Sequence, residues 1–507
     1  MASELAAFED VAHCLNELDL DAKPELSWAA DISSSSRPSF ADAASTEASS
    51  SSSSSTEAGS SSSPSPLQFG DKGGIDPEID AEHEIVVKQA DGASELFSAT
   101  KFEDLNLRPE ILKAIFAMGW SQPSAIQGKA LPLILKSSKQ NMIAQAQSGT
   151  GKTGTFSISM LMRVDASKKH PQAICVLPTI ELAGQVSKVV AQLAAGTNIT
   201  VQKIVKEEVL PKDIPSQILV GTPGKLLDAL KRKHFQPKHI KMFVLDEADQ
   251  MIAAAEGAFS LSRQTAELKN KCTAAQILCF SATFPDNVRE FARRLVPDPV
   301  NLIVLKPSER AVKKITQIYI QCPCDPKVPK SIPQGKLQVL SQIYKELIIP
   351  QSMIFVRTKV SANVLASNME KAGFTVSVMT GDNTVADRAR IFGEFACGKS
   401  KVLITTNLLA RGIDIRTVTL IINFDLPTLQ DESKPDVSTY LHRVGRTGRF
   451  GNEGLAINLV STREDLAMVN FFKEDLSTEI DPYPADNIPK LQKMLDKINE
   501  ANAMVQQ

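Results

Sequence analysis

The stretch AQAQSGTGKT at residues 144–153 has the residue types of a loop that holds nucleotide phosphates. Its glycines let successive backbone N–H groups converge on phosphate oxygens, and the helix expected to follow presents its positive end to them. Lys152 offers a mobile positive charge to the β- and γ-phosphates, and the Thr153 hydroxyl can bind Mg²⁺. The glycine pattern is imperfect, because Ala146 occupies its first position. The residues expected around the phosphates are Ala146, Gln147, Ser148, Gly149, Thr150, Gly151, Lys152 and Thr153.

A second motif, MFVLDEAD at residues 242–249, supplies the acids that nucleotide hydrolysis needs. It is typical of an apolar strand that delivers Asp246 and Glu247 at its carboxyl end, where open parallel sheets place ligands. We expect Asp246 to hold Mg²⁺ through its water shell, and Glu247 to orient or deprotonate the attacking water. The acids could instead only cap a following helix. The pairing of the two motifs favours ATP hydrolysis.

These motifs require sheets to position them. From about residue 100 the chain alternates helix-like segments with short apolar runs, the pattern of parallel strands covered by helices on both faces. One series of expected strands is 141–145, 173–177, 218–220, 242–245 and 277–280, and a second is 353–356, 375–379, 401–405, 419–423 and 455–460. The polar, proline-bearing stretch 305–310 between them predicts a hinge. The sequence therefore predicts an α/β fold with two parallel-sheet domains and a cleft between them.

Charge divides the chain unevenly. Residues 1–97 carry 4 basic and 19 acidic side chains, whereas the remainder carries 52 and 39. A basic body suits a polyanionic partner, although a mildly positive solvated surface is also common. Residues 33–66 are mostly serine and cannot bury enough apolar surface to fold, so residues 1–84 are expected to form a disordered, acidic, serine-rich tail. Within it, the apolar spacing over 11–20 fits either a nuclear export signal or a short amphipathic helix.

Cysteine use and hydropathy exclude several classes of protein. The 7 cysteines are scattered and odd in number, so a secreted disulfide framework is not expected. The pair Cys322 and Cys324 lacks the spacing and the second pair of ligands that a zinc site needs. The amino terminus has no signal-peptide pattern, and no run of eighteen apolar residues occurs. We expect a soluble, intracellular, monomeric protein without membrane insertion.

Three further motifs follow the first two along the chain: SAT at 281–283, TTNLLARGID at 405–414 and HRVGRTGR at 442–449. In this order the five motifs resemble those of DEAD-box RNA helicases, and the resemblance covers about residues 97–480. The segment GWSQPSAIQ at 119–127 resembles the adenine-reading motif of that family. The resemblance implies two tandem RecA-like domains, at 100–305 and 312–507, joined by a linker at 306–311.

The family resemblance also implies roles around ATP. Gln127 would hydrogen-bond the adenine edge, Phe102 would stack on its ring, and Asp414 would meet the ribose. Arg446 and Arg449 are three residues apart, so on a helix they would share a face and point across the cleft at the γ-phosphate as arginine fingers. The residues expected to couple hydrolysis to domain movement are Ser281, Ala282, Thr283 and His442.

An RNA track is implied along the same cleft, with contacts to phosphates and 2′-hydroxyls that do not depend on base sequence. Its expected residues are Pro178, Thr179, Thr222, Pro223, Gly224, Lys225, Arg357, Gly381, Arg388 and Thr405. The chain departs from the family at Ile180, where arginine is usual, at Gly184, at Lys225 and at Val385, where glutamine is usual. These departures put individual RNA contacts in doubt.

Within the family, stretches such as SKVLITTNLLARGIDI and HRVGRTGRFG are most similar to the branch that releases messenger RNA at the nuclear pore. That similarity implies shuttling between nucleus and cytoplasm, a place at the cytoplasmic face of the pore, and three partners: a messenger ribonucleoprotein, a cytoplasmic pore-filament protein and an export mediator that carries inositol hexakisphosphate. It also implies an autoinhibitory element at 85–99, where the pattern is weakly helical. The alternatives are a non-hydrolytic ATP-gated RNA clamp, a helicase of another RNA process, and a metabolite kinase.

Overall fold

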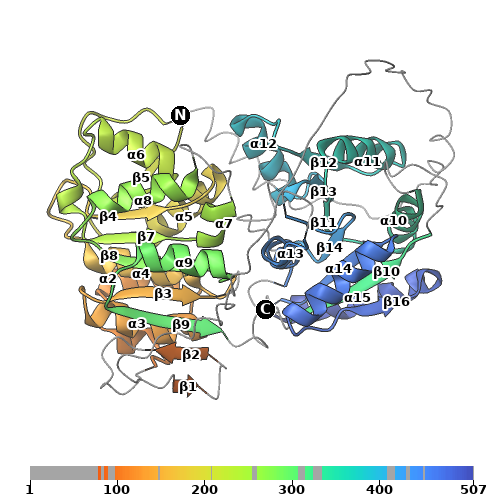
Figure 1. Cartoon of the computed structure of the whole chain (residues 1–507), viewed down its shortest axis with the longest axis horizontal. Helices are drawn as coiled ribbons and strands as arrows, with labels where there is room; N and C mark the ends of the chain where they lie inside the picture. Colours follow the sequence, from red (N-terminus) through yellow and green to blue (C-terminus); the bar gives the residue numbers. More distant parts are fainter. Residues whose placement is uncertain are drawn as a thin grey trace, which may run out of the picture.

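The structure, a computed structural model, describes residues 78–80, 85–88, 98–146, 149–206, 208–253, 260–305, 314–323, 334–407, 417–429, 434–448 and 452–505. Two α/β units lie side by side, the first built from the earlier half of the chain and the second from the later half (Figure 1). The expected export signal at 11–20, the serine tract at 33–66 and the linker at 306–311 lie outside the described residues.

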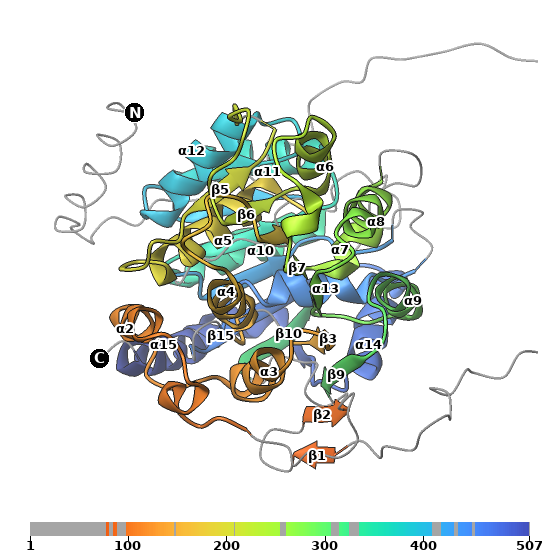
Figure 2. The ribbon, with the colours of Figure 1, turned by 90° about the vertical axis from the view of Figure 1, so that its left-hand side faces the viewer.

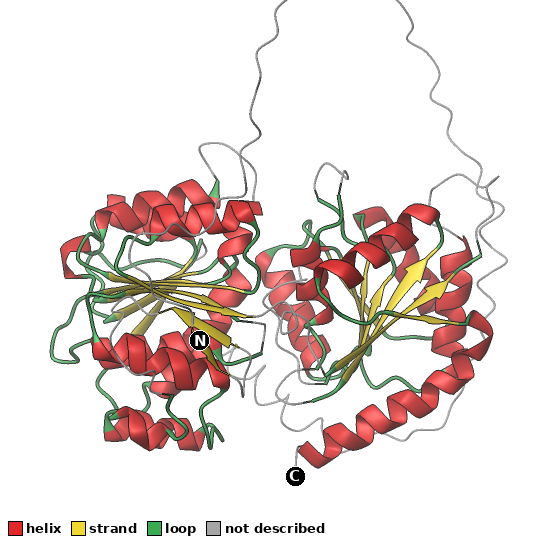
Figure 3. Cartoon of the chain, turned by 60° about the horizontal axis from the view of Figure 1, so that its bottom comes forward, coloured by secondary structure: helices red, strands yellow, loops and turns green. Residues whose placement is uncertain are grey.

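The first sheet contains seven parallel strands, with the phosphate-loop strand inside it. Their order across the sheet is β9 (Val300–Leu305), β3 (Asn141–Gln145), β8 (Gln276–Ser281), β7 (Met242–Leu245), β4 (Ala173–Val176), β6 (Ile218–Gly221) and β5 (Val201–Ile204). Helices cover both faces (Figure 3). One face packs against α2 (Pro109–Ala117), α3 (Ala125–Lys136), α4 (Lys152–Arg163) and α5 (Ile180–Leu193), with the short helix η2 (Phe102–Leu105). The other packs against α6 (Pro223–Lys231), α7 (Ala248–Ala253), α8 (Leu261–Lys271) and α9 (Asp286–Leu295). The short helix η3 (Pro237–His239) precedes β7.

The second sheet is parallel throughout its seven described strands. Their order is β12 (Val376–Met379), β13 (Val402–Thr405), β11 (Ser352–Phe355), β14 (Leu420–Asn423), β15 (Gly454–Val460), β10 (Ile315–Gln321) and β16 (Asp481–Tyr483). One face packs against α10 (Gln334–Glu346), α11 (Lys359–Lys371) and α15 (Ile488–Val505), the last entered through η6 (Ala485–Asn487). The other packs against α12 (Val385–Ala396), α13 (Val437–Val444) and α14 (Arg463–Asp475).

The predicted fold class is confirmed, because both series of apolar runs form parallel sheets covered on two faces. Each of the ten expected strands forms, with ends that differ by one residue at most. Four parallel strands lie outside the expected series, namely β5, β9, β10 and β16. Polar residues interrupt their apolar runs, as Gln202 and Lys203 do in β5 and Gln317 does in β10, so periodicity alone does not reveal them.

The expectation for the amino-terminal segment is partly wrong. Residues expected to be weakly helical form a strand, β2 (Ile85–Lys88), and β1 (Glu78–Asp80) forms within the range expected to be disordered. The two strands pair with each other antiparallel, and β2 continues onto β9 at the sheet edge, with Ile85 opposite Leu305 (Figure 2). Ile85, Val86 and Val87 have β-branched side chains that favour a strand, and β9 offers unpaired backbone groups.

Parallel pairing places the expected functional loops at one edge of each sheet. Gln145, which precedes the phosphate loop, is opposite Ser281, and Leu245, which precedes the two acids, is opposite Val176. Phe355 in the second sheet is opposite both Thr405 and Asn423. The loops that follow these strands therefore begin at the same edge of each sheet, although they are far apart in the sequence.

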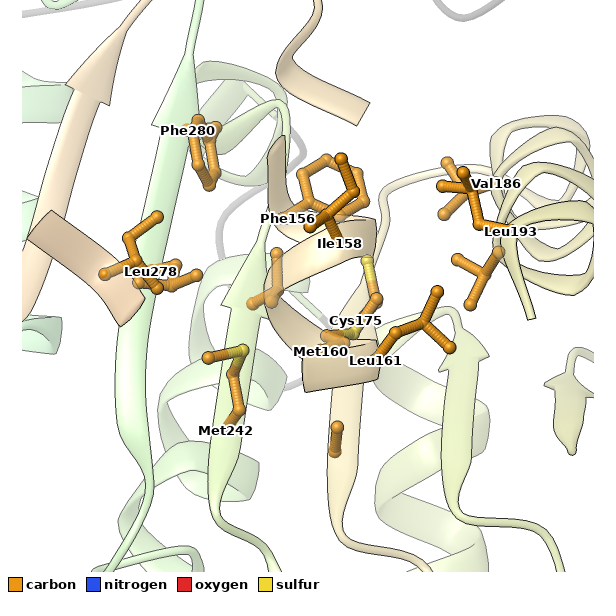
Figure 4. Close-up of a cluster of buried hydrophobic side chains, with 14 of the residues drawn as sticks. Phe156, Ile158, Met160, Leu161, Cys175, Val186, Leu193, Met242, Leu278 and Phe280 are labelled. Carbon is orange, nitrogen blue, oxygen red and sulfur yellow. The ribbon is translucent and has the colours of Figure 1, made fainter. Parts of the chain in front are cut away.

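The core of the first unit holds the phosphate-loop helix rigidly. Side chains from α4, α5 and the strands interdigitate in one cluster (Figure 4), where the rings of Phe156 and Phe280 lie 5.7 Å apart. Helix α4 is buried along most of its length. Burial of apolar surface contributes about 25 cal/mol per Å² to the free energy of folding. This burial stabilises α4, whose first turn faces the site. Among the described residues there is no helix with the length and apolar character needed to cross a bilayer.

Candidate active site between the two domains

The phosphate loop has the backbone shape that the glycines predict. Gly149 and Gly151 have φ of 82° and 105°, a left-handed region that side chains disfavour, and Gly151 caps the start of α4. Lys152 is 6% exposed, and its Nζ donates to the carbonyl oxygen of Ala146 at 2.8 Å. Thr153 lies in the same first helical turn. Gln147 and Ser148 lie outside the described residues. A buried cation at a helix start fits an anionic ligand.

The adenine-reading segment lies against this loop. Gln127 closes a capping box at the start of α3, where its Oε1 accepts from the Ser124 N–H at 2.9 Å. Its Nε2 donates to the Gly151 carbonyl at 3.3 Å. A Cβ on Gly154 would lie 2.5 Å from Gln127 Nε2 and 2.9 Å from the Trp120 ring, so only glycine permits this approach. Gln127 and the half-buried Trp120 therefore border the first turn of α4.

Phe102 requires a correction. Its side chain is 0% exposed and belongs to the core of the first unit, so it presents no face on which an adenine could stack. Trp120 is the aromatic residue that borders the loop instead. A signal for it was present in the sequence, because Trp120 is the aromatic residue inside the segment 119–127 that resembles the adenine-reading motif.

The two acids lie at the end of β7 in an unusual conformation. Asp246 and Glu247 are 4% and 5% exposed, and Glu247 has a φ of 54°, which strains a residue with a side chain. The Glu247 N–H donates to Asp246 Oδ1 at 3.0 Å. Glu247 Oε2 is buried and accepts no hydrogen bond in the part of the chain that is described. His442 Nε2 lies 3.7 Å from this oxygen, too far for a hydrogen bond, and a buried acceptor that lacks one fits a site built for a water molecule or ligand.

The surroundings of Asp246 and Glu247 shift the pKa values of the two acids in opposite directions. Burial, with the neighbouring charges of Glu247 and Asp249, raises the pKa of Asp246 to about 7, although Lys152 opposes the shift. Burial also disfavours the Glu247 carboxylate, but the positive charges of Lys152, His442 and Arg446 lower its pKa overall. The positive charge near Asp246 is thus too weak to offset the effect of burial on its pKa. A buried carboxylate that lacks sufficient positive charge is the environment expected of a divalent-metal ligand. Glu247 is ionised and able to accept a proton.

Asp249 joins the two domains. Its Oδ1 accepts from Ser281 Oγ, at the end of β8, at 2.9 Å, and its Oδ2 accepts from Thr283 Oγ1, in the loop that follows, at 3.1 Å. From α13 of the other domain, His442 Nε2 lies 2.9 Å from Oδ2. Ser438, which no sequence motif singled out, donates to the same oxygen at 2.6 Å. Ala282, between the two hydroxyl residues, is buried and accepts from Gln145 through its carbonyl. Three of the four residues expected to couple hydrolysis to domain movement, Ser281, Thr283 and His442, therefore meet at one carboxylate.

Arg446 is brought to the acids from the second domain. It is 2% exposed, and its Nε donates to the His442 carbonyl at 2.8 Å. The expectation that Arg446 and Arg449 share a helix face is wrong, because α13 ends at Val444 and Arg446 lies in the turn that follows. Glycines at 445 and 448 favour this stop, and Gly448 has a φ of 67°. Arg449 and Asp414 lie outside the described residues.

Most of the expected RNA residues lie on loops and helix starts that follow strands, whereas Thr405 is the buried last residue of β13. Thr179 caps α5 by accepting from the Leu182 N–H, and the Arg357 N–H donates to Asp425 Oδ2 at 2.7 Å. Thr405 donates to the Met379 carbonyl at 2.8 Å. The others sit in the same loops or first turns, at Pro178, Thr222, Pro223, Gly224, Lys225 and Gly381.

Arg388 has a different partner in this structure. From α12 in the second domain it forms an ion pair with Glu181 of α5 at 2.9 Å. The side chains are 18% and 22% exposed, so the pair is largely shielded from water. The contact spans the two domains beside the expected RNA track.

Arg443 is a supporting residue that the sequence motifs did not distinguish. It is 1% exposed, and burial lowers its pKa to about 9. Its guanidinium lies 5.0 Å from the centre of the Phe355 ring and donates to Asn423 Oδ1 at 3.0 Å and to the Asp425 carbonyl at 2.6 Å. Through Nε it also donates to Asn407 Oδ1 at 3.1 Å. Arg443 therefore ties together the carboxyl ends of β11, β13 and β14 in the second domain.

The fold and the site define a two-domain phosphate-loop nucleotide hydrolase, with its acids on one domain and its arginine on the other. Comparison with known proteins agrees. The model of the DEAD/DEAH box helicase family matches residues 124–291, and that of the helicase conserved C-terminal domain matches residues 335–451. The ATP-dependent RNA helicase DBP5 of Lodderomyces elongisporus is 43% identical over 434 residues, which is 84% of this chain and 82% of the relative. The chain belongs to the DEAD-box family of ATP-dependent RNA helicases, in the branch that contains DBP5.

Two solved structures are similar over most of the chain. S. cerevisiae Dbp5 bound to RNA and ADP BeF3 is 42% identical, with a TM-score of 0.73, and the match covers 79% of this chain and 100% of that one. A point variant of S. cerevisiae Dbp5, solved with Nup159, a Gle1 variant, IP6 and ADP, is 40% identical, with a TM-score of 0.57, over 78% of this chain and 100% of that one. The resemblance drawn from the sequence motifs is thereby confirmed.

Proposed function

We propose that this helicase remodels messenger ribonucleoprotein during export, at the cytoplasmic face of the nuclear pore. ATP and single-stranded RNA close the two domains, closure distorts the RNA strand, and hydrolysis reopens the cleft. The observation that carries the proposal is the burial of Glu247 from one domain together with His442 and Arg446 from the other. Hydrolysis then depends on closure, because each domain holds only half of the groups required.

Each half of the site has a distinct task. Lys152 and the loop N–H groups hold the phosphates, and Thr153 and Asp246 would hold Mg²⁺. When bound, Mg²⁺ supplies positive charge that offsets the charge developing on the phosphates. Glu247 orients and deprotonates the attacking water, while Arg446, with Arg449, stabilises the γ-phosphate from across the cleft. Ser281, Thr283 and His442 link these events through Asp249.

The assignment of domains and RNA residues is part of the proposal. We place the domains at 100–305 and 312–507, with the linker at 306–311 and a regulatory segment at 85–99. RNA would run over the loops at Thr179, Thr222 and Arg357 and past the end of β13, which Thr405 closes. Arg388 would either leave Glu181 to bind an RNA phosphate or keep its ion pair and hold the two domains together beside the RNA. Phosphate contacts of this kind carry no base specificity.

The partners follow from the related Dbp5 structures. Dbp5 has been solved with RNA, and with Nup159, Gle1 and IP6. We infer that a pore-filament protein and an inositol-hexakisphosphate-bound mediator act on this chain in the same way. The similarity of 40% over 78% of the chain supports a shared mode of docking.

Phosphate release in steady state tests this function. We expect slow release from the chain alone, a marked increase with single-stranded RNA, and a further increase when the mediator with inositol hexakisphosphate is added. Binding of RNA and ATP without any RNA-stimulated release would instead indicate a non-hydrolytic clamp, and release that no RNA alters would contradict both.

Replacing Trp120 with alanine is expected to raise the KM for ATP by roughly tenfold, since loss of base stacking typically costs about 1–3 kcal/mol. The KM for RNA at saturating ATP should change much less. Phe116 provides a matched control, because it is an exposed aromatic residue (41%) on α2. If Phe116→Ala raises the KM as much as Trp120→Ala does, the stacking role is contradicted.

A further inference from the structure

Ser438 makes a contact between the domains that neither the motifs nor the roles above explain. It lies on α13, four residues before His442, so both side chains project from the same face of the helix. Ser438 Oγ donates to Asp249 Oδ2 at 2.6 Å and His442 Nε2 lies 2.9 Å from the same oxygen. In Figure 1, α13 and α7 face each other where the two domains meet.

Four side chains that contact the Asp249 carboxylate divide by domain. Ser281 and Thr283 come from its own domain, at 2.9 and 3.1 Å, and their contacts do not require the second domain. Ser438 and His442 come from the other domain and reach Asp249 only when the domains approach. Asp249 is 4% exposed, so its carboxylate is paired by protein groups rather than by bulk water.

The Ser438 contact has the chemistry of a strong hydrogen bond. A hydroxyl that donates to a carboxylate makes a charge-assisted bond, and such bonds are typically about 2.5–2.7 Å long and about twice as strong as neutral ones. Asp249 follows Glu247 by two residues, after the end of the same strand. A group that fixes Asp249 from the second domain therefore also fixes the segment that carries the general base.

We propose that Ser438 is a positioning residue that stabilises the closed arrangement of the two domains by donating a second interdomain hydrogen bond to Asp249, beside His442. In this role Ser438 acts through Asp249 and not by binding nucleotide or RNA itself. This inference rests on the proposed function, in which ATP and RNA bind the closed arrangement best. Because ligands that bind one state gain affinity as that state becomes more populated, loss of the Ser438 bond weakens RNA binding only in the ATP-bound state.

The experiment measures the affinity of the full-length chain for a fluorescently labelled single-stranded RNA, with ADP–beryllium fluoride and without nucleotide. Ser438→Ala is expected to weaken binding about tenfold with ADP–beryllium fluoride, the effect of one hydrogen bond to a charged group, and less than about twofold without nucleotide. Ser438→Thr keeps the hydroxyl and is expected to restore binding to within about threefold of the wild type.

Thr439→Ala is the matched control. Thr439 is the next residue of the helix, but its hydroxyl donates to Asp436 within the second domain at 2.6 Å. Its replacement should lower thermal stability without weakening RNA binding in the presence of ADP–beryllium fluoride. Three results overturn the proposal: wild-type affinity in Ser438→Ala, an equally weak Ser438→Thr, or an equal loss in Thr439→Ala. If the wild type itself binds RNA no more tightly with ADP–beryllium fluoride, the proposed function fails, and this inference fails with it.

Discussion

Replacing Arg446 with alanine is expected to reduce RNA-stimulated ATP turnover by roughly 10³- to 10⁵-fold, the range known for arginine fingers in nucleotide hydrolases. The side chain is 2% exposed and comes from the second domain, so it can meet the γ-phosphate only across the closed cleft. Its positive charge also lowers the pKa of Glu247, which places the two groups in the same electrostatic environment. Turnover should be measured at saturating ATP and RNA, so that a loss reports the chemical step.

Arg294→Ala is a suitable control for this substitution. Arg294 lies on α9 and forms an exposed ion pair with Glu290, a type of contact that contributes at most about 1 kcal/mol. Its loss should leave turnover near the wild-type rate. Arg446→Lys keeps a positive charge without the planar fork, and it should recover only a small part of the activity. Turnover within about tenfold of the wild type in Arg446→Ala would exclude the finger role, since a finger contributes far more.

Glu247→Gln is expected to lower turnover by about 10²- to 10⁴-fold, the usual contribution of a general base. The amide has nearly the same shape but cannot accept a proton from water. The buried Oε2, which accepts no hydrogen bond among the described residues, is the atom that would orient that water. ATP and RNA binding should persist, since Lys152 and the loop remain, so the variant should accumulate as a stable complex with both.

The matched control here is Glu267→Gln. Glu267 is an exposed acid on α8 in an ion pair with Lys231 at 2.9 Å, and its neutralisation should change turnover by less than about twofold. Single-turnover hydrolysis, together with equilibrium binding of ATP and RNA, separates loss of chemistry from loss of affinity. A Glu247→Gln chain that hydrolyses ATP at the wild-type rate would remove Glu247 from the mechanism.

Local motifs predicted much of the fold and of the site. The glycines at 149 and 151 require a loop of unusual φ, and the apolar run that ends at Asp246 requires a buried strand. Both are properties of a few consecutive residues, so spacing and residue type suffice to predict them. The same holds for the two series of parallel strands, whose continuous apolar runs need covering on both faces.

Strand pairing at the amino terminus depended on distant segments. Ile85 and Val86 pair with β1 within their own stretch and with β9, far later in the chain, at one of the two edges of the parallel sheet. Pairing of this kind depends on which edge the rest of the fold leaves open, so it has no local signature.

The sequence by itself determined the class of chemistry, the two-domain α/β fold, and the positions of the glycine-rich loop and of the two acids, because each follows from short-range pattern. Only the tertiary structure decided that Phe102 is core while Trp120 borders the loop, that α13 stops before Arg446, and that Ser438 reaches Asp249. The physical reason is that burial and contact between domains depend on which distant surfaces pack together, and spacing along one chain does not contain that information.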